Sequence, residues 1–197
     1  MNVESHPWEF GWLLHFQGAQ ADAHGPELRV GHALNYRPYM PEDFEALYAL
    51  EEACFEPPFR FGRRYMKSLV GSESAAVWIA EDEGEMAGFA ILVWVKRRGD
   101  VLAYLETLEV RPEVRGRGTG GELLRLCEES ARAAEAEAIW LHVDAENGAA
   151  IGLYRAHGFE RQGRVEGYYP EGRAAEVFAK RGTHEQNSEL NGTVRRE

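Results

Sequence analysis

Residues 115–121 read Arg-Gly-Arg-Gly-Thr-Gly-Gly, a glycine-rich turn between a stretch typical of a strand and a stretch typical of a helix. Glycines let the backbone of a turn approach a bulky group closely, and the free N–H groups and dipole at a helix start attract phosphate. Arg115 and Arg117 add positive charge to a chain whose formal net charge is −11. The turn therefore predicts a phosphate-binding site, although a flexible turn with two solvated arginines would give the same pattern.

Two common nucleotide-binding motifs fit this turn poorly. A P-loop requires Gly-Lys-Ser/Thr, whereas Gly120 is followed here by Gly121 and Glu122. The Rossmann pattern G-x-G-x-x-G is matched, and Asp144 lies about 23 residues beyond it, close to the usual ~20. However, a loop separates the first glycine from the strand, and too little chain follows for the remaining βαβ units. These departures argue against both folds.

Hydrophobic periodicity around the turn predicts a mixed α/β (α+β) domain built on one sheet. The expected strands are residues 28–36, 76–81, 87–95, 101–110, 139–143 and 176–179. The expected helices are residues 41–54, 61–70, 119–134 and 149–157. We therefore predict one domain over residues 28–180, preceded by an extension at residues 1–27 and followed by a mobile tail at residues 181–197.

The turn also carries a resemblance to a known family. Arg115-x-x-Gly118-x-Gly120 is similar to the Q/R-x-x-G-x-G/A signature of the GNAT superfamily of acyl-CoA N-acyltransferases. Other segments resemble the same family in the same order: 108–112 (Leu-Glu-Val-Arg-Pro), 122–124 (Glu-Leu-Leu), 142–147 (His-Val-Asp-Ala-Glu-Asn), 149–154 (Ala-Ala-Ile-Gly-Leu-Tyr) and 157–159 (His-Gly-Phe). Because these matches extend over about residues 30–180, the resemblance is far more specific than the glycine turn alone.

The resemblance implies the GNAT fold, a central mixed sheet flanked by helices, with acetyl-CoA as co-substrate and no metal. In this family the glycine turn holds the pyrophosphate of coenzyme A, and the preceding strand offers backbone N–H groups to the acyl oxygen. A tyrosine contacts the coenzyme sulfur or protonates the leaving thiolate. The implied cofactor-binding residues are Leu108, Glu109, Val110, Arg115, Gly116, Arg117, Gly118, Thr119, Gly120, Gly121, Asn147 and Tyr154.

A second element narrows the resemblance to N-terminal acetyltransferases, which include the bacterial ribosomal-protein alanine type. Residues 167–170 (Gly-Tyr-Tyr-Pro) resemble a loop that lies over the peptide in that branch, which implies Tyr168 and Tyr169 as substrate-binding residues. Phe55 and Glu56, in a proline-rich break between two expected helices, would line the peptide entrance. The alternatives are an aromatic hairpin at the edge of the core and an ordinary helix-ending loop.

The strand expected at 139–143 departs from the ribosomal-protein enzymes, which usually carry a glutamate where this chain has His142. It resembles instead a eukaryotic subset that pairs this histidine with a tyrosine on the preceding strand, and Tyr104 stands at the matching position. The resemblance therefore implies Tyr104 and His142 as a catalytic pair acting through a water, together with Tyr154. Glu106 is a rival base, because strand alternation places it on the face of Tyr104 unless a bulge intervenes.

These residue types suit an α-amine acceptor. An α-amino group has a pKa of about 7.7–8.0 and lysine one of about 10.4, so deprotonating the α-amine at neutral pH costs roughly 3.5 kcal/mol less. An imidazole with a pKa of about 6.5 is an adequate base for an α-amine and a poor one for lysine. We therefore expect a protein or peptide N-terminus as substrate. A small amine (polyamine, amino acid or antibiotic) and a non-catalytic acyl-CoA-binding module are the alternatives.

Composition limits the remaining function classes. With 44% hydrophobic residues the chain is not wholly disordered, and its net charge of −11 argues against a general nucleic-acid binder. The two cysteines, Cys54 and Cys127, lie far apart, without the spacing of a zinc site or a disulfide framework. No segment reads as a signal peptide or a membrane span, so we expect a cytoplasmic protein without membrane or nucleic-acid partners. The sequence leaves the oligomeric state open.

Overall fold

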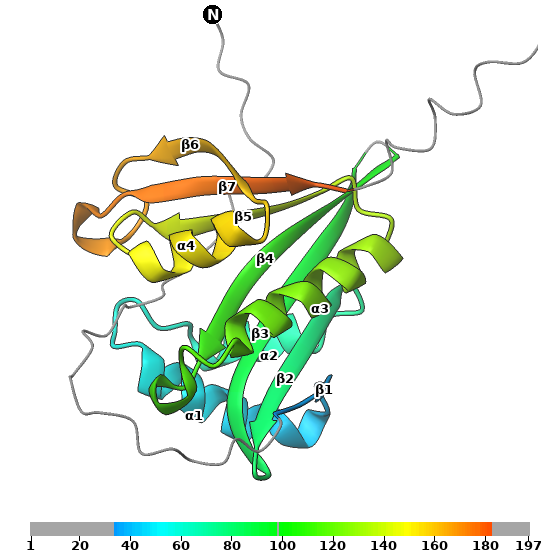
Figure 1. The fold of residues 1–197 in the computed structure, drawn as a ribbon, viewed down its shortest axis with the longest axis vertical. Helices are drawn as coiled ribbons and strands as arrows, with labels where there is room; N and C mark the ends of the chain where they lie inside the picture. The colour runs from blue at the N-terminus through cyan, green and yellow to red at the C-terminus, as the bar shows by residue number, and fades with distance from the viewer. Residues whose placement is uncertain (1–33, 98, 183–197) are drawn as a thin grey trace, which may run out of the picture.

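The computed structural model describes residues 34–97 and 99–182. The expected extension at residues 1–27, most of the strand expected at 28–36, and residues 183–197 of the expected tail lie outside these ranges. In the described part of the chain, a seven-stranded sheet has the order β1-β2-β3-β4-β5-β7-β6 and is packed against helices (Figure 1). The predicted mixed α/β (α+β) class is confirmed.

The boundaries of most elements follow the predicted ones closely, with one strand added. The strand expected to end at residue 36 continues to Pro38, because Arg37 and Pro38 pair with β2 at the sheet edge. The strands are β1 (Asn35–Pro38), β2 (Ala75–Asp82), β3 (Glu85–Arg97), β4 (Asp100–Val110), β5 (Ala138–Asp144), β6 (Glu160–Val165) and β7 (Ala175–Arg181). The helices are α1 (Phe44–Cys54), α2 (Arg63–Val70), α3 (Thr119–Ala133) and α4 (Gly148–Ala156), with 3-10 turns η1 (Pro41–Asp43), η2 (Pro112–Val114) and η3 (Pro170–Gly172). Periodicity does not predict β6, because its sequence Glu-Arg-Gln-Gly-Arg-Val is polar and mostly exposed at the sheet edge.

The two faces of the sheet carry separate hydrophobic cores. Helices α3 and α4 cover one face, where Leu123 and Tyr154 are buried, and Figure 1 shows α3 running across β2, β3 and β4. Helices α1 and α2 cover the other face with Leu47 and Met66. Each helix therefore contributes one apolar stripe to one core. Among the described residues, no helix is both long enough and apolar enough to cross a membrane.

Strand β4 contains a β-bulge that changes which of its side chains share a face. Its register with β3 shifts at Glu106, which the pairing skips. As a result Tyr104, Glu106 and Glu109 lie on the α1/α2 side, where Glu106 meets α2 and Glu109 meets α1. Leu108 and Val110 belong to the core of α3 and α4. The bulge thus places these three polar side chains on one face and the apolar side chains of Leu108 and Val110 on the other.

Strands β4 and β5 are parallel neighbours that pair over a short length, Leu102–Tyr104 with Ala138–Trp140. Beyond these residues the described strands diverge (Figure 1). Strand β4 stays paired with β3, and β5 stays paired with β7, to the ends of both strands. The sheet therefore opens into a wedge between β4 and β5, and the glycine turn follows β4 at this end.

Candidate active site

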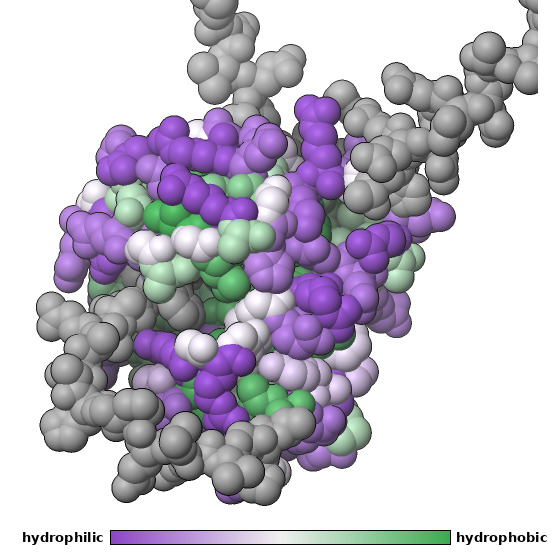
Figure 2. Space-filling model, viewed as in Figure 1, coloured by the Kyte–Doolittle hydropathy of each residue, from purple (hydrophilic) through white to green (hydrophobic). Residues whose placement is uncertain are grey.

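A cavity of about 450 Å³ lies between the N-terminus of α3 and helix α4. Its walls come from the end of β4, the glycine turn and the small residues of α4. In Figure 2 the hollow below α4 exposes hydrophobic and neutral surface bordered by hydrophilic side chains. This combination of an apolar groove with a helix start is suited to a ligand that carries both an anionic group and an apolar arm.

Glycines keep this cavity open. Gly118 has a left-handed φ of 84° and ends the turn directly before α3, a conformation that glycine adopts at little cost. A Cβ on Gly120 would lie 3.4–3.7 Å from the side chains of Leu153, Leu108 and Val110, so any larger side chain would fill the space. Because Gly118 offers no side-chain cap, the first N–H groups of α3 are available to an anion.

Most of the predicted cofactor-binding residues line this cavity. They are Leu108, Val110, Arg115, Gly116, Gly118, Thr119, Gly120, Gly121 and Tyr154. Helix α4 adds residues that the sequence reading missed, although a helix rich in alanine and glycine signals a close approach of two surfaces: Ala149, Ala150, Gly152, Leu153 and Ala156. Burial raises the pKa of the Tyr154 hydroxyl, which therefore keeps its proton at neutral pH.

Three predicted cofactor residues do not line the cavity. Arg117 Nη1 forms an ion pair with Asp82 Oδ2 at 2.8 Å on the β2 side of the turn. Asn147 Oδ1 accepts a hydrogen bond from Ala150 N at 3.0 Å and caps α4. The Glu109 side chain is fully buried on the α1/α2 side of the sheet. Contacts of these residues with a cofactor stay predictions.

The other side of the wedge carries a cluster of polar and aromatic side chains. Tyr104 Oη lies 2.9 Å from His142 Nδ1, and His142 is 6% exposed. The two residues meet because β4 and β5 are neighbours there. Side chains alternate along each strand, so Leu105 and Leu141, which are adjacent to them in sequence, point into the core on the other face of the sheet. The structure thus brings together two residues that lie 38 positions apart in the sequence.

The loop of residues 166–174 closes over this pair. The ring of Tyr168 stacks on His142 with centroids 4.5 Å apart and an interplanar angle of 5°, and its hydroxyl shares a hydrogen bond with Tyr104. Tyr169 stands edge-on to Tyr168 at 4.9 Å and is 2% exposed. Tyr168 is therefore a wall of the cluster, whereas Tyr169 anchors the loop in the protein interior.

Glu106 extends the cluster toward α2. Tyr65 Oη donates a hydrogen bond to Glu106 Oε2 at 3.2 Å, a contact the sequence reading missed because nothing in the pattern of α2 distinguishes this tyrosine from a core residue. Burial raises the pKa of Glu106 to about 7, although the Tyr65 hydrogen bond opposes the shift. A carboxyl group with this pKa exchanges protons readily at neutral pH.

The two residues predicted at the peptide entrance differ in their surroundings. Phe55 is 5% exposed at the end of α1, whereas Glu56 is exposed in the loop that follows. Phe59, further along the same loop, lies against the 166–174 loop, with its ring centroid 5.6 Å from Arg173 Cζ. A wall formed by Phe55 and Glu56 stays a prediction, and Phe59 is the residue of this loop that meets the loop of Tyr168.

The chain matches the profile of the acetyltransferase (GNAT) family over residues 44–159. It belongs to this family. The crystal structure of the ribosomal-protein-S18-alanine N-acetyltransferase from Escherichia coli is similar, with 26% identity and a TM-score of 0.66 over 75% of this chain and 92% of that one.

Two curated relatives of this GNAT protein have different acceptors in their names. The N-alpha-acetyltransferase RimI of Mycobacterium tuberculosis is 34% identical over 90 residues, 46% of this chain and 55% of the relative. The mycothiol acetyltransferase of Pseudarthrobacter chlorophenolicus is 29% identical over 166 residues, 76% of this chain and 49% of the relative. The chain thus spans about half the length of these curated relatives.

On the α1/α2 side of the sheet, this GNAT protein holds a buried pair of carboxyl groups that the sequence did not reveal. Glu51 of α1 and Glu109 of β4 are both 0% exposed and hydrogen-bond to each other. Glu51 Oε1 accepts from Phe61 N at 2.6 Å, and Glu109 Oε1 accepts from Thr107 Oγ1 at 3.0 Å. Burial and the neighbouring carboxylate raise the pKa of Glu109 well above its usual range, so the pair shares a proton.

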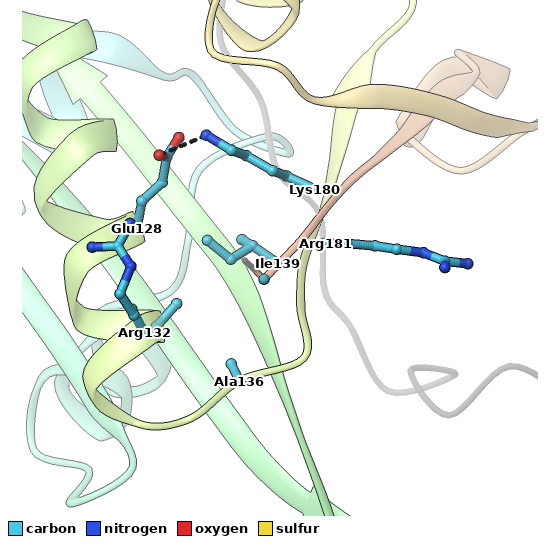
Figure 3. A pocket seen from close by; sticks show the side chains of 8 residues that line it. Glu128, Arg132, Ala136, Ile139, Lys180 and Arg181 are labelled. Atoms are coloured by element: carbon cyan, nitrogen blue, oxygen red, sulfur yellow. Dashed lines mark hydrogen bonds and ion pairs between the residues drawn. The ribbon is translucent and has the colours of Figure 1, made fainter. Parts of the chain in front are cut away.

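A second cavity, of about 40 Å³, lies between α3, β5 and β7 (Figure 3). Its polar border is the ion pair of Lys180 Nζ with Glu128 Oε2 at 2.7 Å, and Ile139 forms its floor. A space of this size holds water rather than a substrate. Within the described ranges, no group of three or more histidine, cysteine or acidic side chains is arranged to bind a metal ion.

Proposed function

We propose that this protein transfers an acetyl group from acetyl-CoA to the α-amino group of a protein or peptide N-terminus. The observation that carries the proposal is the Tyr104–His142 hydrogen bond beneath the stacked ring of Tyr168, at the opening between β4 and β5. This arrangement places a proton acceptor and a loop suited to an extended chain at one point. The two relatives named for α-amino acetylation, from Escherichia coli and Mycobacterium tuberculosis, support the same acceptor class.

The donor fits the cavity between α3 and α4. The helix start and the backbone of residues 116–121 suit a pyrophosphate, and the apolar wall of Leu108, Val110 and Leu153 suits a pantetheine arm. The thioester would then lie near the wedge. There the unpaired edge of β4 around Leu108 can offer backbone N–H groups to the carbonyl oxygen.

The proton leaves the amine through the acceptor cluster. An α-amine attacks the thioester carbonyl as the free base, so that an N–C bond forms and the C–S bond breaks. His142, acting through a water, takes the proton, and the hydrogen bond to Tyr104 holds its ring in place. In the tautomer that donates Nδ1–H to Tyr104, Nε2 is the basic atom. Tyr154, which keeps its proton in the donor cavity, donates a hydrogen bond to the leaving thiolate, and the proton taken up by His142 is released to water.

Glu106 is the competing base on the same face. Its pKa of about 7 is close to that of an α-amine, and it lies in the same cluster as Tyr104 and Tyr168. The flanking tyrosines pair with both groups: Tyr65 donates its hydroxyl to Glu106, and Tyr104 accepts from His142 Nδ1.

A small amine is the second candidate acceptor, because the mycothiol acetyltransferase relative covers 76% of this chain. We favour a peptide because the 166–174 loop places two adjacent tyrosines over the cluster, where backbone groups of an extended chain need donors and acceptors. The reaction is proposed for the cytoplasm, and the two cysteines, both in the described region, are free thiols as a reducing compartment requires.

Steady-state assays with acetyl-CoA test the proposal against both alternatives. Purified protein is offered a panel of short peptides that differ in their first two residues, the same peptides with a blocked α-amine, and a panel of polyamines, amino acids and thiol-containing amines. We expect turnover of free α-amine peptides and none of blocked ones. Higher kcat/KM values for small amines would overturn the peptide assignment, and acetyl-CoA binding without any turnover would identify a non-catalytic module.

A further inference from the structure

Arg173, in the loop that carries Tyr168, contacts two segments that are distant in sequence. Its Nη2 atom is ion-paired with Asp144 Oδ2 at the end of β5 and lies 3.6 Å from Glu146 Oε2 in the turn before α4. Its guanidinium Cζ lies 5.6 Å from the ring centroid of Phe59 in the α1–α2 loop. One side chain therefore joins both loops of the acceptor side to the base of α4.

The ion pair is largely buried, so each charge is stabilised mainly by the other. The Asp144 side chain is 1% exposed and that of Arg173 is 23% exposed. Asp144 Oδ1 also accepts from Glu146 N at 2.8 Å, so this carboxylate is fixed by its own turn. Removing the arginine would leave a buried charge without its partner, and the loop would lose its attachment.

The backbone around Arg173 converts this attachment into the placement of Tyr168. Arg173 O accepts from Tyr169 N at 2.9 Å, and Ala174 O accepts from Ala145 N at 3.0 Å. Glu171, which lies between Tyr169 and Arg173, has a left-handed φ of 61°, which is unfavourable for a residue with a side chain. A turn with an unfavourable φ persists when surrounding contacts stabilise it, and the ion pair of Arg173 is such a contact.

We propose that Arg173 is a positioning residue that sets the distance between the α1–α2 loop and the Tyr168 loop, and thereby the size of the acceptor side chain that fits between them. The inference rests on the proposed function of these two loops as the acceptor site. Arginine suits the position because its planar group pairs with a carboxylate and also lies over an aromatic ring, which lysine does less well. None of the residues in this attachment lines the cavity proposed for the donor.

The test compares Arg173→Ala and Arg173→Lys with Arg125→Ala, a matched control because Arg125 forms exposed ion pairs with Glu122 and Glu129 on α3, outside both loops. We expect Arg173→Ala to raise the KM for peptide at least tenfold while the Kd for acetyl-CoA changes less than twofold. The ratio of kcat/KM between small and large first residues should fall toward one. Arg173→Lys and Phe59→Leu should each show a smaller effect in the same direction.

A readout that needs no turnover separates this inference from the proposed function. Hydrogen exchange of the loops at 55–62 and 166–174 should be faster in Arg173→Ala than in the native protein, with exchange in α3 unchanged. If the native protein acetylates no peptide but both loops loosen together, the proposed function fails and the positioning role stands. Unchanged exchange, or an equal loss of acetyl-CoA and peptide binding, would show that Arg173 does not position the two loops.

Discussion

The two sides of the candidate active site, the proposed donor cavity and the proposed acceptor cluster, are built in opposite ways. The donor cavity consists mainly of backbone and small side chains from two continuous segments, residues 108–121 and 149–156. The acceptor cluster consists of large side chains from separate elements: Tyr65 of α2, Tyr104 and Glu106 of β4, His142 of β5, and Tyr168 of the following loop. A site made of backbone is encoded locally, whereas a site made of side chains exists only once the sheet has assembled.

This difference implies that a substitution on one side should impair the function of that side and leave the function of the other intact. Changes in the cluster should reduce the rate of the chemical step and leave the donor affinity intact, because no cluster residue lines the cavity. Changes in the glycine turn should weaken donor binding and leave the chemical step intact at saturation. Substitutions on each side test this separation.

The largest effect is expected at the Tyr104–His142 pair. His142→Ala should lower kcat by roughly 10²–10⁴-fold, the usual range for a positioned acid or base, and Tyr104→Phe should lower it less because the base itself remains. The Kd for acetyl-CoA, measured by calorimetry, should stay within twofold. An unchanged kcat in both variants would refute the base assignment, and a weakened Kd would break the separation of the two sides.

A smaller effect is expected at the glycine turn. Gly118→Ala forces a side chain into a left-handed conformation at φ 84°, which costs roughly 1–2 kcal/mol and should weaken acetyl-CoA binding about tenfold. Saturating kcat should change little. Gly163→Ala in β6 is the control, because a Cβ there meets nothing within 4 Å and its φ is not positive. Equal losses in both variants would mean that the turn conformation is not special.

A pH profile sharpens the assignment within the acceptor side. Because the carboxylate is the basic form, Glu106 as base would make kcat/KM fall as pH decreases through about 7. The Tyr65 hydrogen bond lowers the pKa of Glu106, so Tyr65→Phe should move this limb to higher pH and reduce activity roughly two- to fivefold near pH 6.5. The two profiles should converge at high pH. If neither Tyr65→Phe nor Glu106→Gln changes the fall of kcat/KM at low pH, the base is His142 rather than Glu106.

The smallest effect concerns stability and the buried pair of Glu51 and Glu109. The pKa of Glu109 is higher in the folded than in the unfolded protein, so the folded state binds more protons above about pH 4.3 and stability falls as pH rises. Glu109→Gln removes this loss, which can reach about 1.4 kcal/mol per pH unit. Urea unfolding at pH 5 and pH 8 should show that the variant gains more free energy of unfolding, relative to the native protein, at pH 8 than at pH 5. A lower stability at both pH values would mean that the carboxyl pair stabilises the fold.

The contrast between the two sides also explains what could be predicted from the sequence. The glycine turn places its residues in the cavity because a local backbone pattern needs no tertiary information. Strand β6 was missed because its polar residues show no alternation. The bulge at Glu106 was foreseen only as a possibility, since period-two alternation does not reveal where a register shifts.

Contacts between side chains of different elements are harder to predict from the sequence. Tyr104 and His142 were paired through a family resemblance, and the structure places them in contact, but periodicity alone would leave His142 as a core residue. Arg117 was assigned to the cofactor by its charge, yet Asp82 from another strand engages it. Glu51 with Glu109, and Tyr65 with Glu106, join residues of different elements without any sequence signal.

The short pairing between β4 and β5 has a consequence for folding energetics. Only three residues of each strand join the two halves of the sheet, Leu102–Tyr104 and Ala138–Trp140. A ligand seated in the opening would bridge the strands where their own hydrogen bonds end. Occupancy then adds directly to the free energy of unfolding, by about 2.7 kcal/mol at a hundredfold excess over Kd. With the proposed donor as that ligand, the abundance of the folded protein would follow the supply of acetyl-CoA.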